Sequence, residues 1–244
     1  MKALILAAGY GTRLRSIAEN TPKPLLPIND KPLINYIIDR IQSLNGLTEI
    51  IVISNNKFYD IFLQWAKKQK TKVPIKIIND GTNVPEERLG SIGDIAFALK
   101  DAKINDDILV VGGDNLFDYN IDQYIEFSRS KTGCVTLGLY DIGDITQAHL
   151  FGVVELDQQS KVRSFEEKPQ KPKSTLIAMC CYYFPKSTLD LVHRYLSEIK
   201  KSDTAGDYIR WLHEKSNVYG FKFTGKWYDI GSVESYYEAQ KMFK

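Results

Sequence analysis

A glycine loop near the N-terminus carries the residue types best suited to holding a polyphosphate. The apolar run Ala3–Ala8 is short enough to be a buried strand, and it leads directly into Gly-Tyr-Gly-Thr-Arg at positions 9–13. Two glycines so spaced let the backbone turn sharply and present N–H groups to an anion. Arg13 adds a fork of donors that suits phosphate oxygens, and Lys23, held between two prolines, adds a second cation. Together these residues predict a polyphosphate site.

Two familiar phosphate loops do not match this segment. A dinucleotide fingerprint needs a third glycine where this chain has Leu14, and a P-loop needs Gly-Lys-Ser/Thr, which does not follow Gly11. Leu14 and the two cations therefore argue against a nicotinamide-dependent oxidoreductase. Two glycines alone are typical of an ordinary turn, so the prediction depends on the longer string, which continues as Pro-Lys-Pro-Leu-Leu-Pro-Ile at 22–28.

The spacing of apolar residues indicates the elements that position this loop. Segment 32–44 has apolar residues at helical spacing, and 49–54 is a short apolar run typical of a buried strand. Such segments alternate through the first half, which predicts a parallel sheet with right-handed crossovers. In another predicted helix, 91–99, Ser91 and Asp94 have the spacing of a capping box. The second half is richer in strands. We therefore predict an α/β fold, a Rossmann-like three-layer sandwich with a mixed, mostly parallel central sheet and a small substrate lobe.

A carboxylate follows one of the predicted strands, at Leu-Val-Val-Gly-Gly-Asp in 109–114. Ligands of such sheets bind outside the carboxyl ends of the strands, where both the glycine loop and Asp114 fall. An aspartate there can cap a helix or bind a metal. A triphosphate on the loop would bring magnesium held by one or two carboxylates, which favours the metal. Asp229, in Trp-Tyr-Asp-Ile-Gly at 227–231, is the candidate second ligand, although the sequence alone does not bring the two aspartates together.

Length and composition exclude several classes of protein. The chain has 244 residues, enough for one α/β domain, and its formal net charge of +2 provides no broad basic field for nucleic acid or a membrane surface. No apolar run reaches the ~20 residues of a membrane span, and the N-terminal run is too short for a signal sequence. The histidines and cysteines lack zinc-ligand spacing, and the adjacent Cys180 and Cys181 are expected in the core. We expect a cytoplasmic protein.

The motifs at 9–14 and 22–28 resemble the signature of the sugar-phosphate nucleotidyltransferases, the family that includes glucose-1-phosphate thymidylyltransferases and related pyrophosphorylases. The family also carries Gly-Asp-Asn and Trp-x-Asp-x-Gly motifs, which match the surroundings of Asp114 and Asp229, and its two aspartates hold magnesium. The similarity runs from Ala3 to about Tyr237. It implies the nucleotide-diphospho-sugar transferase type of fold and Mg²⁺ as the cofactor, and a homodimer is common in such folds.

A second cluster, Ser-Phe-Glu-Glu-Lys-Pro at 164–169, would ordinarily be a solvated charged turn after a strand. It is similar to the family's acceptor site, in which the glutamate binds sugar hydroxyls and the lysine binds the sugar phosphate. The resemblance implies these roles for Glu167 and Lys168, and it puts the backbone of Gly152 close to the sugar. Tyr182 aligns with an aromatic residue near the same pocket, although a core aromatic on a strand is an equal interpretation.

The resemblance implies one domain over residues 1–244, with a nucleotide-binding half at about 1–118 and a sugar-phosphate-binding half at about 119–244. We expect nucleotide binding by residues on and beside the glycine loop: Leu6, Ala8, Gly9, Gly11, Thr12, Arg13, Lys23, Gly90 and Asp114. We expect catalysis by four charged residues: Arg13, Lys23, Asp114 and Asp229.

The implied reaction transfers a nucleoside monophosphate from a nucleoside triphosphate to a sugar 1-phosphate, with glucose 1-phosphate the expected acceptor. An oxygen of the sugar phosphate attacks the α-phosphorus in line, and pyrophosphate leaves. The nucleophile is already an anion, so no general base is required, and catalysis consists of positioning and charge neutralisation.

Three features of the chain depart from the family pattern. Segment 79–89 is not the short Gln-Pro-x-Pro-x-Gly loop with which the thymidylyltransferases read the base, so the base stays open. Met179 and Cys180 stand where the family often has Thr-Gly, which leaves the sugar open. Longer relatives carry a C-terminal extension used for regulation or assembly, and since the sequence ends at Lys244 we expect no such regulatory site.

Two other functions remain as alternatives. Cytidylyltransferases acting on phosphocholine-like phosphates share the glycine loop and both aspartates, although Glu167 and Lys168 favour a sugar. A non-catalytic module that senses nucleotide sugars would be favoured by loss of the four charged catalytic residues, and all four are present.

Overall fold

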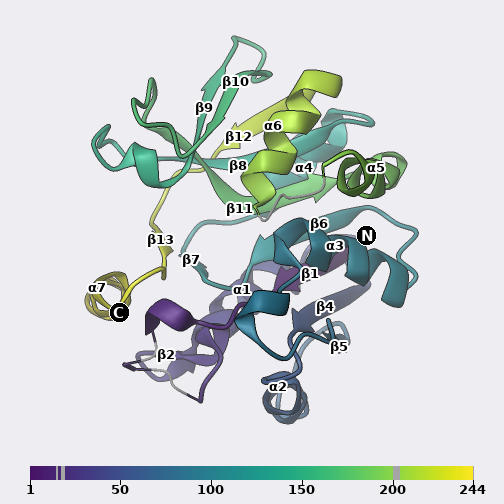
Figure 1. Cartoon of the computed structure of the whole chain (residues 1–244), viewed down its shortest axis with the longest axis vertical. Coiled ribbons are helices and arrows are strands. Elements are labelled where there is room, and N and C mark those ends of the chain that lie inside the picture. Colours follow the sequence, from purple (N-terminus) through teal and green to yellow (C-terminus); the bar gives the residue numbers. More distant parts are fainter. Residues whose placement is uncertain (15, 18–19, 200–203, 244) are drawn as a thin grey trace.

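The computed structural model describes residues 1–14, 16–17, 20–199 and 204–243, and a nine-stranded mixed sheet forms its centre (Figure 1). Seven strands follow the order β10-β9-β11-β6-β1-β4-β5. In addition, β8 pairs with β11, and β12 pairs with β8. The strands of this sheet are β1 (Lys2–Leu6), β4 (Glu49–Ser54), β5 (Ile75–Asn79), β6 (Ile108–Gly112), β8 (Val135–Asp141), β9 (Gly152–Leu156), β10 (Val162–Glu167), β11 (Leu176–Phe184) and β12 (Val218–Lys222).

The strands nearest the glycine loop are parallel. β1 lies between β4 and β6, with Leu4 opposite Ile51 on one side and Val110 on the other. β11 then pairs antiparallel with β6, and β8 and β9 pair antiparallel with β11. The predicted mixed sheet is therefore confirmed. Because β1 and β6 are parallel neighbours, the segments that follow them leave the sheet at the same edge.

Helices cover both faces of the sheet and complete three layers. One face carries α1 (Leu33–Ile41), α2 (Tyr59–Ala66) and α4 (Asp122–Ser130). The other carries α3 (Gly90–Asp101), α5 (Asp190–Glu198) and α6 (Ala205–Lys215). Within the described ranges, no helix combines the length and apolar character needed to cross a bilayer.

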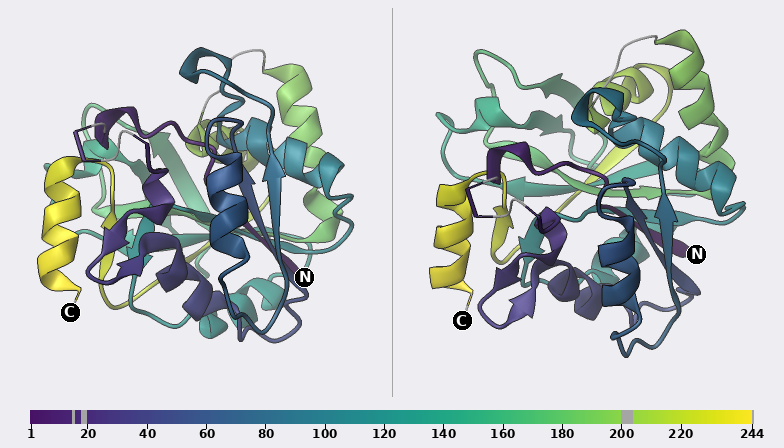
Figure 2. Two further views of the ribbon diagram at one scale, coloured as in Figure 1. Left: turned by 90° about the horizontal axis from the view of Figure 1, so that it is seen from below. Right: turned by 60° about the horizontal axis from the view of Figure 1, so that its bottom comes forward.

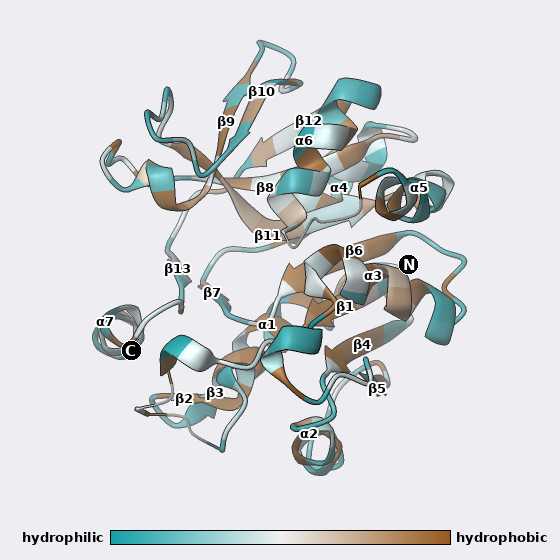
Figure 3. Ribbon diagram, viewed as in Figure 1, coloured by the Kyte–Doolittle hydropathy of each residue, from teal (hydrophilic) through white to brown (hydrophobic). Residues whose placement is uncertain are grey.

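Strand side chains alternate between two separate cores. Leu4 and Ile5 are both fully buried, yet Leu4 packs with α3 and Ile5 with α1, because successive side chains of a strand point to opposite faces. The central strands are accordingly hydrophobic along their length, whereas the helices turn hydrophilic residues outward (Figure 3).

Two short ribbons and α7 (Val233–Met242) return the end of the chain to its beginning. Figure 2 shows α7 alongside the ribbon formed by β2 (Pro27–Ile28) and β3 (Lys31–Pro32). The Tyr236 hydroxyl donates a 2.7 Å hydrogen bond to the Pro27 carbonyl. A small third core lies beneath the helix and includes Leu14 and Ile230. The other ribbon is formed by β7 (Asn115–Phe117) and β13 (Trp227–Asp229).

The expected capping box at the start of α3 is wrong. The helix begins at Gly90, its N-cap residue is Leu89, and no side chain caps it. Gly90 has a φ of +74°, so the chain turns into the helix one residue earlier than the polar pattern indicates. Ser91 therefore lies within the first turn. Helix α4 was not predicted, because its buried face includes the polar Ser128 and weakens the apolar pattern.

Candidate active site

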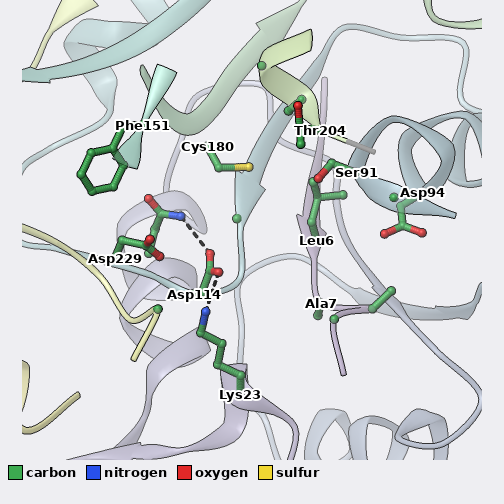
Figure 4. Close-up of a pocket in the computed structure, with 18 of the residues that line it drawn as sticks. Leu6, Ala7, Lys23, Ser91, Asp94, Asp114, Phe151, Cys180, Thr204 and Asp229 are labelled. Carbon is green, nitrogen blue, oxygen red and sulfur yellow. Dashed lines mark hydrogen bonds and ion pairs between the residues drawn. The ribbon is translucent and has the colours of Figure 1, made fainter. Parts of the chain in front are cut away.

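A cleft of about 570 Å³ opens at the carboxyl ends of β1 and β6, and Figure 4 shows its interior. Every site residue expected from the sequence lines this cleft, and the structure therefore brings together segments from both halves of the chain. Their roles in binding and catalysis stay predictions. These residues are Leu6, Ala8, Gly9, Gly11, Thr12, Arg13, Lys23, Gly90, Asp114, Gly152, Glu167, Lys168, Tyr182 and Asp229.

The glycine loop is anchored to β4 and open toward the cleft. Asn55 donates a side-chain hydrogen bond of 2.8 Å to the Ala8 carbonyl, which fixes the start of the loop. Gly11 has a φ of +60°, a conformation that glycine adopts without steric cost. A Cβ at Gly9 or Gly11 would find no atom within 4 Å, so the loop presents backbone, not packed side chains, to the cleft. Arg13 follows in a short 3-10 helix and is exposed.

A close backbone approach sets Asp114 beside this loop. The Gly113 N–H donates a 2.9 Å hydrogen bond to the Leu6 carbonyl, and a Cβ at Gly113 would lie 2.7 Å from that oxygen. Only glycine fits there without displacing the backbone of β1. The second glycine of the Gly-Gly-Asp sequence thus brings the end of β6 against the end of β1.

Asp114 pairs with Lys23 in the centre of the cleft. The Lys23 ammonium donates a 2.8 Å hydrogen bond to Asp114 Oδ2, and the Asn115 amide donates to Oδ1 at 3.2 Å (Figure 4). Burial of the carboxyl raises its pKa, but the charge and hydrogen bond of Lys23 outweigh burial and hold the pKa of Asp114 below its usual value. Asp114 is therefore an anion throughout the physiological pH range.

Asp229 reaches Asp114 through the ribbon formed by β7 and β13. In this antiparallel pair Asp229 stands opposite Asn115, and the Ile230 N–H donates to the Asp114 carbonyl at 3.0 Å. The Trp227 indole also donates to Asn115 Oδ1 at 2.7 Å, which fastens the two strands together. Residues 115 positions apart in sequence thus become neighbours.

Burial and the negative charge of Asp114 together raise the pKa of Asp229 to about 6, while Lys23 and Arg13 oppose the rise. The protein thus holds two carboxylates whose repulsion a divalent cation would relieve. Among the described residues, no group of three or more His, Cys, Asp or Glu side chains could hold a metal. Magnesium usually takes only one or two protein carboxylates and fills its remaining positions with phosphate and water oxygens, so this pair fits it.

Glu167 ends β10 on the other side of the cleft, and Lys168 directly follows the strand. Burial raises the pKa of Glu167, and Lys168 Nζ stands 3.8 Å from Glu167 Oε1. The Lys168 side chain is 57% exposed, so its charge can reach an anion in the cleft. The backbone N–H of Lys168 donates to the Phe151 carbonyl at 3.0 Å, which fixes the turn.

Gly152 has a structural reason for lacking a side chain that the sequence did not indicate. A Cβ there would lie 2.6 Å from the Phe165 ring and 3.1 Å from Glu167 Oε2. The glycine therefore makes room for two protein side chains. A contact between its backbone and a sugar stays a prediction.

Met179 and Cys180, the two residues of β11 that depart from the family pattern, face opposite sides of the strand. Met179 is 1% exposed and points into the core between the sheet and helices α1, α2 and α4. Its sulfur accepts a hydrogen bond from the Tyr119 hydroxyl at 3.1 Å. Cys180 lines the cleft near Asp114, and burial raises the pKa of its thiol well above its usual value. Tyr182 is 4% exposed; it packs in the opposite core and also borders the cleft. Of the two departures, only Cys180 can alter the pocket.

Segment 79–89 is tied to the glycine loop by a hydrogen-bonded chain. Tyr10 donates through its hydroxyl to Thr82 Oγ1 at 2.9 Å, and Thr82 donates from its N–H and hydroxyl to Asp80 Oδ1 at 2.7 and 2.8 Å. Burial raises the pKa of Asp80. Asp80 lines the cleft at this end, so this segment contributes to the surface beside the glycine loop.

Several lining residues were not found from the sequence. Thr204 and Gly206 enter the cleft at the start of α6, and Phe151 and Trp227 meet there with ring centroids 5.6 Å apart. The spacing of Thr204 and Asp207, typical of a helix start, was the one available signal. It predicts a helix terminus and does not indicate what the terminus faces.

The chain matches the family model described as "Nucleotidyl transferase" over residues 2–244. It is 31% identical over 237 residues to "D-glycero-alpha-D-manno-heptose 1-phosphate guanylyltransferase" of Campylobacter jejuni, with 97% of each chain covered. It is also 29% identical over 242 residues to the "Bifunctional protein GlmU" of Methanocaldococcus jannaschii, covering 99% of this chain and 54% of that protein. The chain thus spans about half the length of this and similar relatives.

The same architecture occurs in solved structures. A "Putative Glucose-1-Phosphate Thymidylyltransferase" from Bacillus anthracis superposes with a TM-score of 0.83 at 24% identity, covering 99% of this chain and 94% of that one. At that identity the likeness speaks for the fold alone. The match to the family model spans nearly the whole sequence, and the full-length relative in Campylobacter supports it. The chain therefore belongs to the nucleotidyl transferase family.

Proposed function

We propose that this protein transfers a nucleoside monophosphate from a nucleoside triphosphate to a sugar 1-phosphate and releases pyrophosphate. In this proposal the residues of about 1–118 bind the nucleotide, and those of about 119–244 bind the sugar phosphate. The observation that carries the proposal is the pairing of Asp229 with Asn115 across the ribbon, because it sets two carboxylates beside a glycine loop and Lys23. Named relatives act on heptose and glucose 1-phosphates with different bases, which supports the reaction class.

The charges of the cleft suit the joining of two anions. Two like charges about 5 Å apart repel by several kcal/mol in a partly dry site, so a triphosphate and a sugar phosphate need cations between and around them. Lys23 lies on the glycine-loop side of the cleft and Lys168 on the β10 side. In the proposal Lys23 binds the triphosphate and Lys168 the sugar phosphate.

Magnesium is the proposed cofactor, held by Asp114 and Asp229. When bound, it would neutralise charge on the phosphates. The chain's own residues do the positioning: the Gly9–Thr12 backbone cradles the phosphates, Arg13 faces the departing pyrophosphate, and Glu167 accepts hydrogen bonds from sugar hydroxyls. The sugar phosphate is already an anion, so no protein base needs to remove a proton.

The test is pyrophosphate release from glucose 1-phosphate with magnesium and, separately, ATP, GTP, CTP, UTP or dTTP. Release with one or two of them supports the proposal and identifies the base. If none of the five triphosphates gives pyrophosphate with glucose 1-phosphate but another sugar phosphate does, the proposed reaction stands with a different acceptor. Release only with phosphocholine and CTP would favour the cytidylyltransferase alternative, and silence throughout would contradict an enzymatic role.

Replacing Lys23 by methionine should tighten metal binding to the nucleotide-free protein by about tenfold. The Lys23 ammonium occupies Asp114 Oδ2 at 2.8 Å, so a metal that uses this oxygen must first displace it. Methionine keeps the apolar stem and removes the competing charge; a tenfold change corresponds to about 1.4 kcal/mol. Mn²⁺ binding followed by electron paramagnetic resonance measures the effect. The control is Lys31→Met, which breaks an exposed pair with Asp39 outside the cleft. Unchanged or weaker Mn²⁺ binding in the Lys23 variant would show that the ammonium does not compete with the metal.

A further inference from the structure

The side chain of Glu167 occupies the space that a side chain at position 206 would need. A Cβ at Gly206 would lie 1.8 Å from Glu167 Oε2 and 2.4 Å from its Cδ, and the next nearest atom is Glu167 Cγ at 3.2 Å. All three nearest atoms therefore belong to one residue. The Glu167 carboxyl group therefore rests directly on the backbone of α6, and its side chain is only 16% exposed.

The start of α6 holds Gly206 in this position. Thr204 is the N-cap residue: its hydroxyl accepts a hydrogen bond from the Asp207 N–H at 3.1 Å and donates to Asp207 Oδ2 at 2.9 Å. Ala205 is 8% exposed and belongs to the same core cluster as Phe165 of β10. The first turn of α6 is therefore held together by its own cap, and it packs against β10 through the core.

A second glycine approaches the carboxyl group from β9. A Cβ at Gly152 would lie 3.1 Å from the same Oε2 atom. Two backbone segments without side chains thus close around the carboxyl group, and both line the cleft. Lys168, whose ammonium stands 3.8 Å from the other oxygen, Oε1, borders the cleft as well. The direction in which the carboxyl points is consequently set by packing against these two backbone segments, together with the ion pair to Lys168.

We propose that Gly206 is a positioning residue for the sugar phosphate: it admits the Glu167 carboxyl group to its seat against α6 and so aims that group at the acceptor. The inference rests on the proposed function. A methyl group at position 206 would collide with the far end of a flexible side chain, so Glu167 can rotate away while the fold persists. The protein would then keep its nucleotide site and lose the arrangement that receives the sugar.

The experiment is a double-mutant cycle on pyrophosphate release, with glucose 1-phosphate and the triphosphate that the wild-type protein uses. Gly206→Ala should raise the KM for the sugar phosphate about tenfold or more and leave the KM for the triphosphate within about twofold. Its thermal midpoint should be no lower than that of the wild type, since alanine favours a helix over glycine. In a Glu167→Ala background, the same substitution should cause no further rise, because the carboxyl group with which the new methyl group collides is gone.

The matched control is Glu214→Ala, at the exposed far end of α6, which should change neither KM. An unchanged KM for the sugar phosphate in Gly206→Ala, or an effect that persists in the Glu167→Ala background, would overturn the inference.

Failure of the proposed function would appear separately, as a wild-type protein that releases no pyrophosphate with any substrate pair. In that case a crystal structure of Gly206→Ala still tests whether Gly206 makes room for the Glu167 carboxyl group. A displaced Glu167 carboxyl group supports the seat, and an undisplaced one refutes it.

Discussion

Asparagine at both Asp114 and Asp229 should reduce magnesium-dependent pyrophosphate release by about 10³-fold or more. The two carboxylates meet across the β7–β13 ribbon, and in the proposed reaction they hold the ion that neutralises the phosphates. A metal ion contributes several kcal/mol to such a transition state, and each 1.36 kcal/mol is a factor of ten. Initial rates at saturating substrates, measured over a range of Mg²⁺ concentrations, test this. Full magnesium-dependent activity in the double variant would refute the metal assignment.

Asp118→Asn is the matched control for this pair. Asp118 directly follows β7 and accepts a 2.7 Å hydrogen bond from the Lys226 N–H, but it does not line the cleft. Asparagine keeps an acceptor oxygen in the same place, so both folding and the magnesium dependence should stay as in the wild type. A comparable loss of rate in this variant would mean that the effect comes from the ribbon and not from the carboxylates in the cleft.

Asp229→Asn alone should stabilise the metal-free protein while it lowers activity. The folded-state pKa of Asp229 is raised from 3.8 to about 6, so between these pH values the folded protein binds a proton that the unfolded chain has released. The free energy of unfolding therefore falls as pH rises through that window, and the loss is complete above it. Asparagine does not ionise, so the variant keeps the free energy of unfolding that the wild type loses on ionisation of Asp229. We expect a gain of about 1–3 kcal/mol at pH 7 that disappears near pH 4, measured by urea unfolding at both pH values. Equal stability of the two proteins at pH 7 would contradict the raised pKa.

Removing the Arg13 side chain should lower turnover by about 10²–10³-fold with little change in stability. Arg13 lies on the 3-10 helix after the glycine loop, is exposed, and lines the cleft, and its charge lowers the pKa of Asp229. In the proposed reaction it faces the pyrophosphate as negative charge develops, and the loss of one such donor typically costs this much. Turnover of Arg13→Ala at saturating substrates is the measurement.

Arg40→Ala, an exposed substitution in the last turn of α1 and outside the cleft, provides the comparison for Arg13. Both variants should keep the wild-type thermal midpoint, since exposed substitutions rarely move stability by more than about 0.5 kcal/mol. If Arg13→Ala retained full turnover, the role of this residue on the pyrophosphate would be wrong.

In the proposed function, the choice of base and sugar depends on the residues that line the cleft. Thr82 links Asp80 to Tyr10 of the glycine loop, so Asp80 is the residue of segment 79–89 to vary when the base preference of the proposed reaction is examined. Cys180 is the one departure on β11 that borders the cleft, which makes it the residue to vary when the acceptor sugar is examined. Met179 points into the core and can be left unchanged.

The fold could be predicted from local patterns wherever the apolar spacing was strong. Alternating strands and helices in the first half indicated a parallel sheet, and β1, β4, β5 and β6 form one. Prediction failed where the pattern of apolar and polar residues does not reveal the feature that forms the element. The start of α3 depends on the positive φ of Gly90 and not on a polar cap, and α4 is buried through only a few side chains of a mostly polar segment.

The sequence by itself determined the chemical character of the site. A glycine loop followed by two cations indicates phosphate binding, because backbone N–H groups, guanidinium and ammonium are what phosphate oxygens bind. The tertiary structure alone decided which distant residues complete the site. Asp229 meets Asp114 because β13 pairs with β7, and the Glu167 carboxyl group is seated because Gly206 of α6 leaves it room. Both contacts join segments far apart in the chain, and their formation depends on the packing of whole elements, which no local pattern of residues encodes.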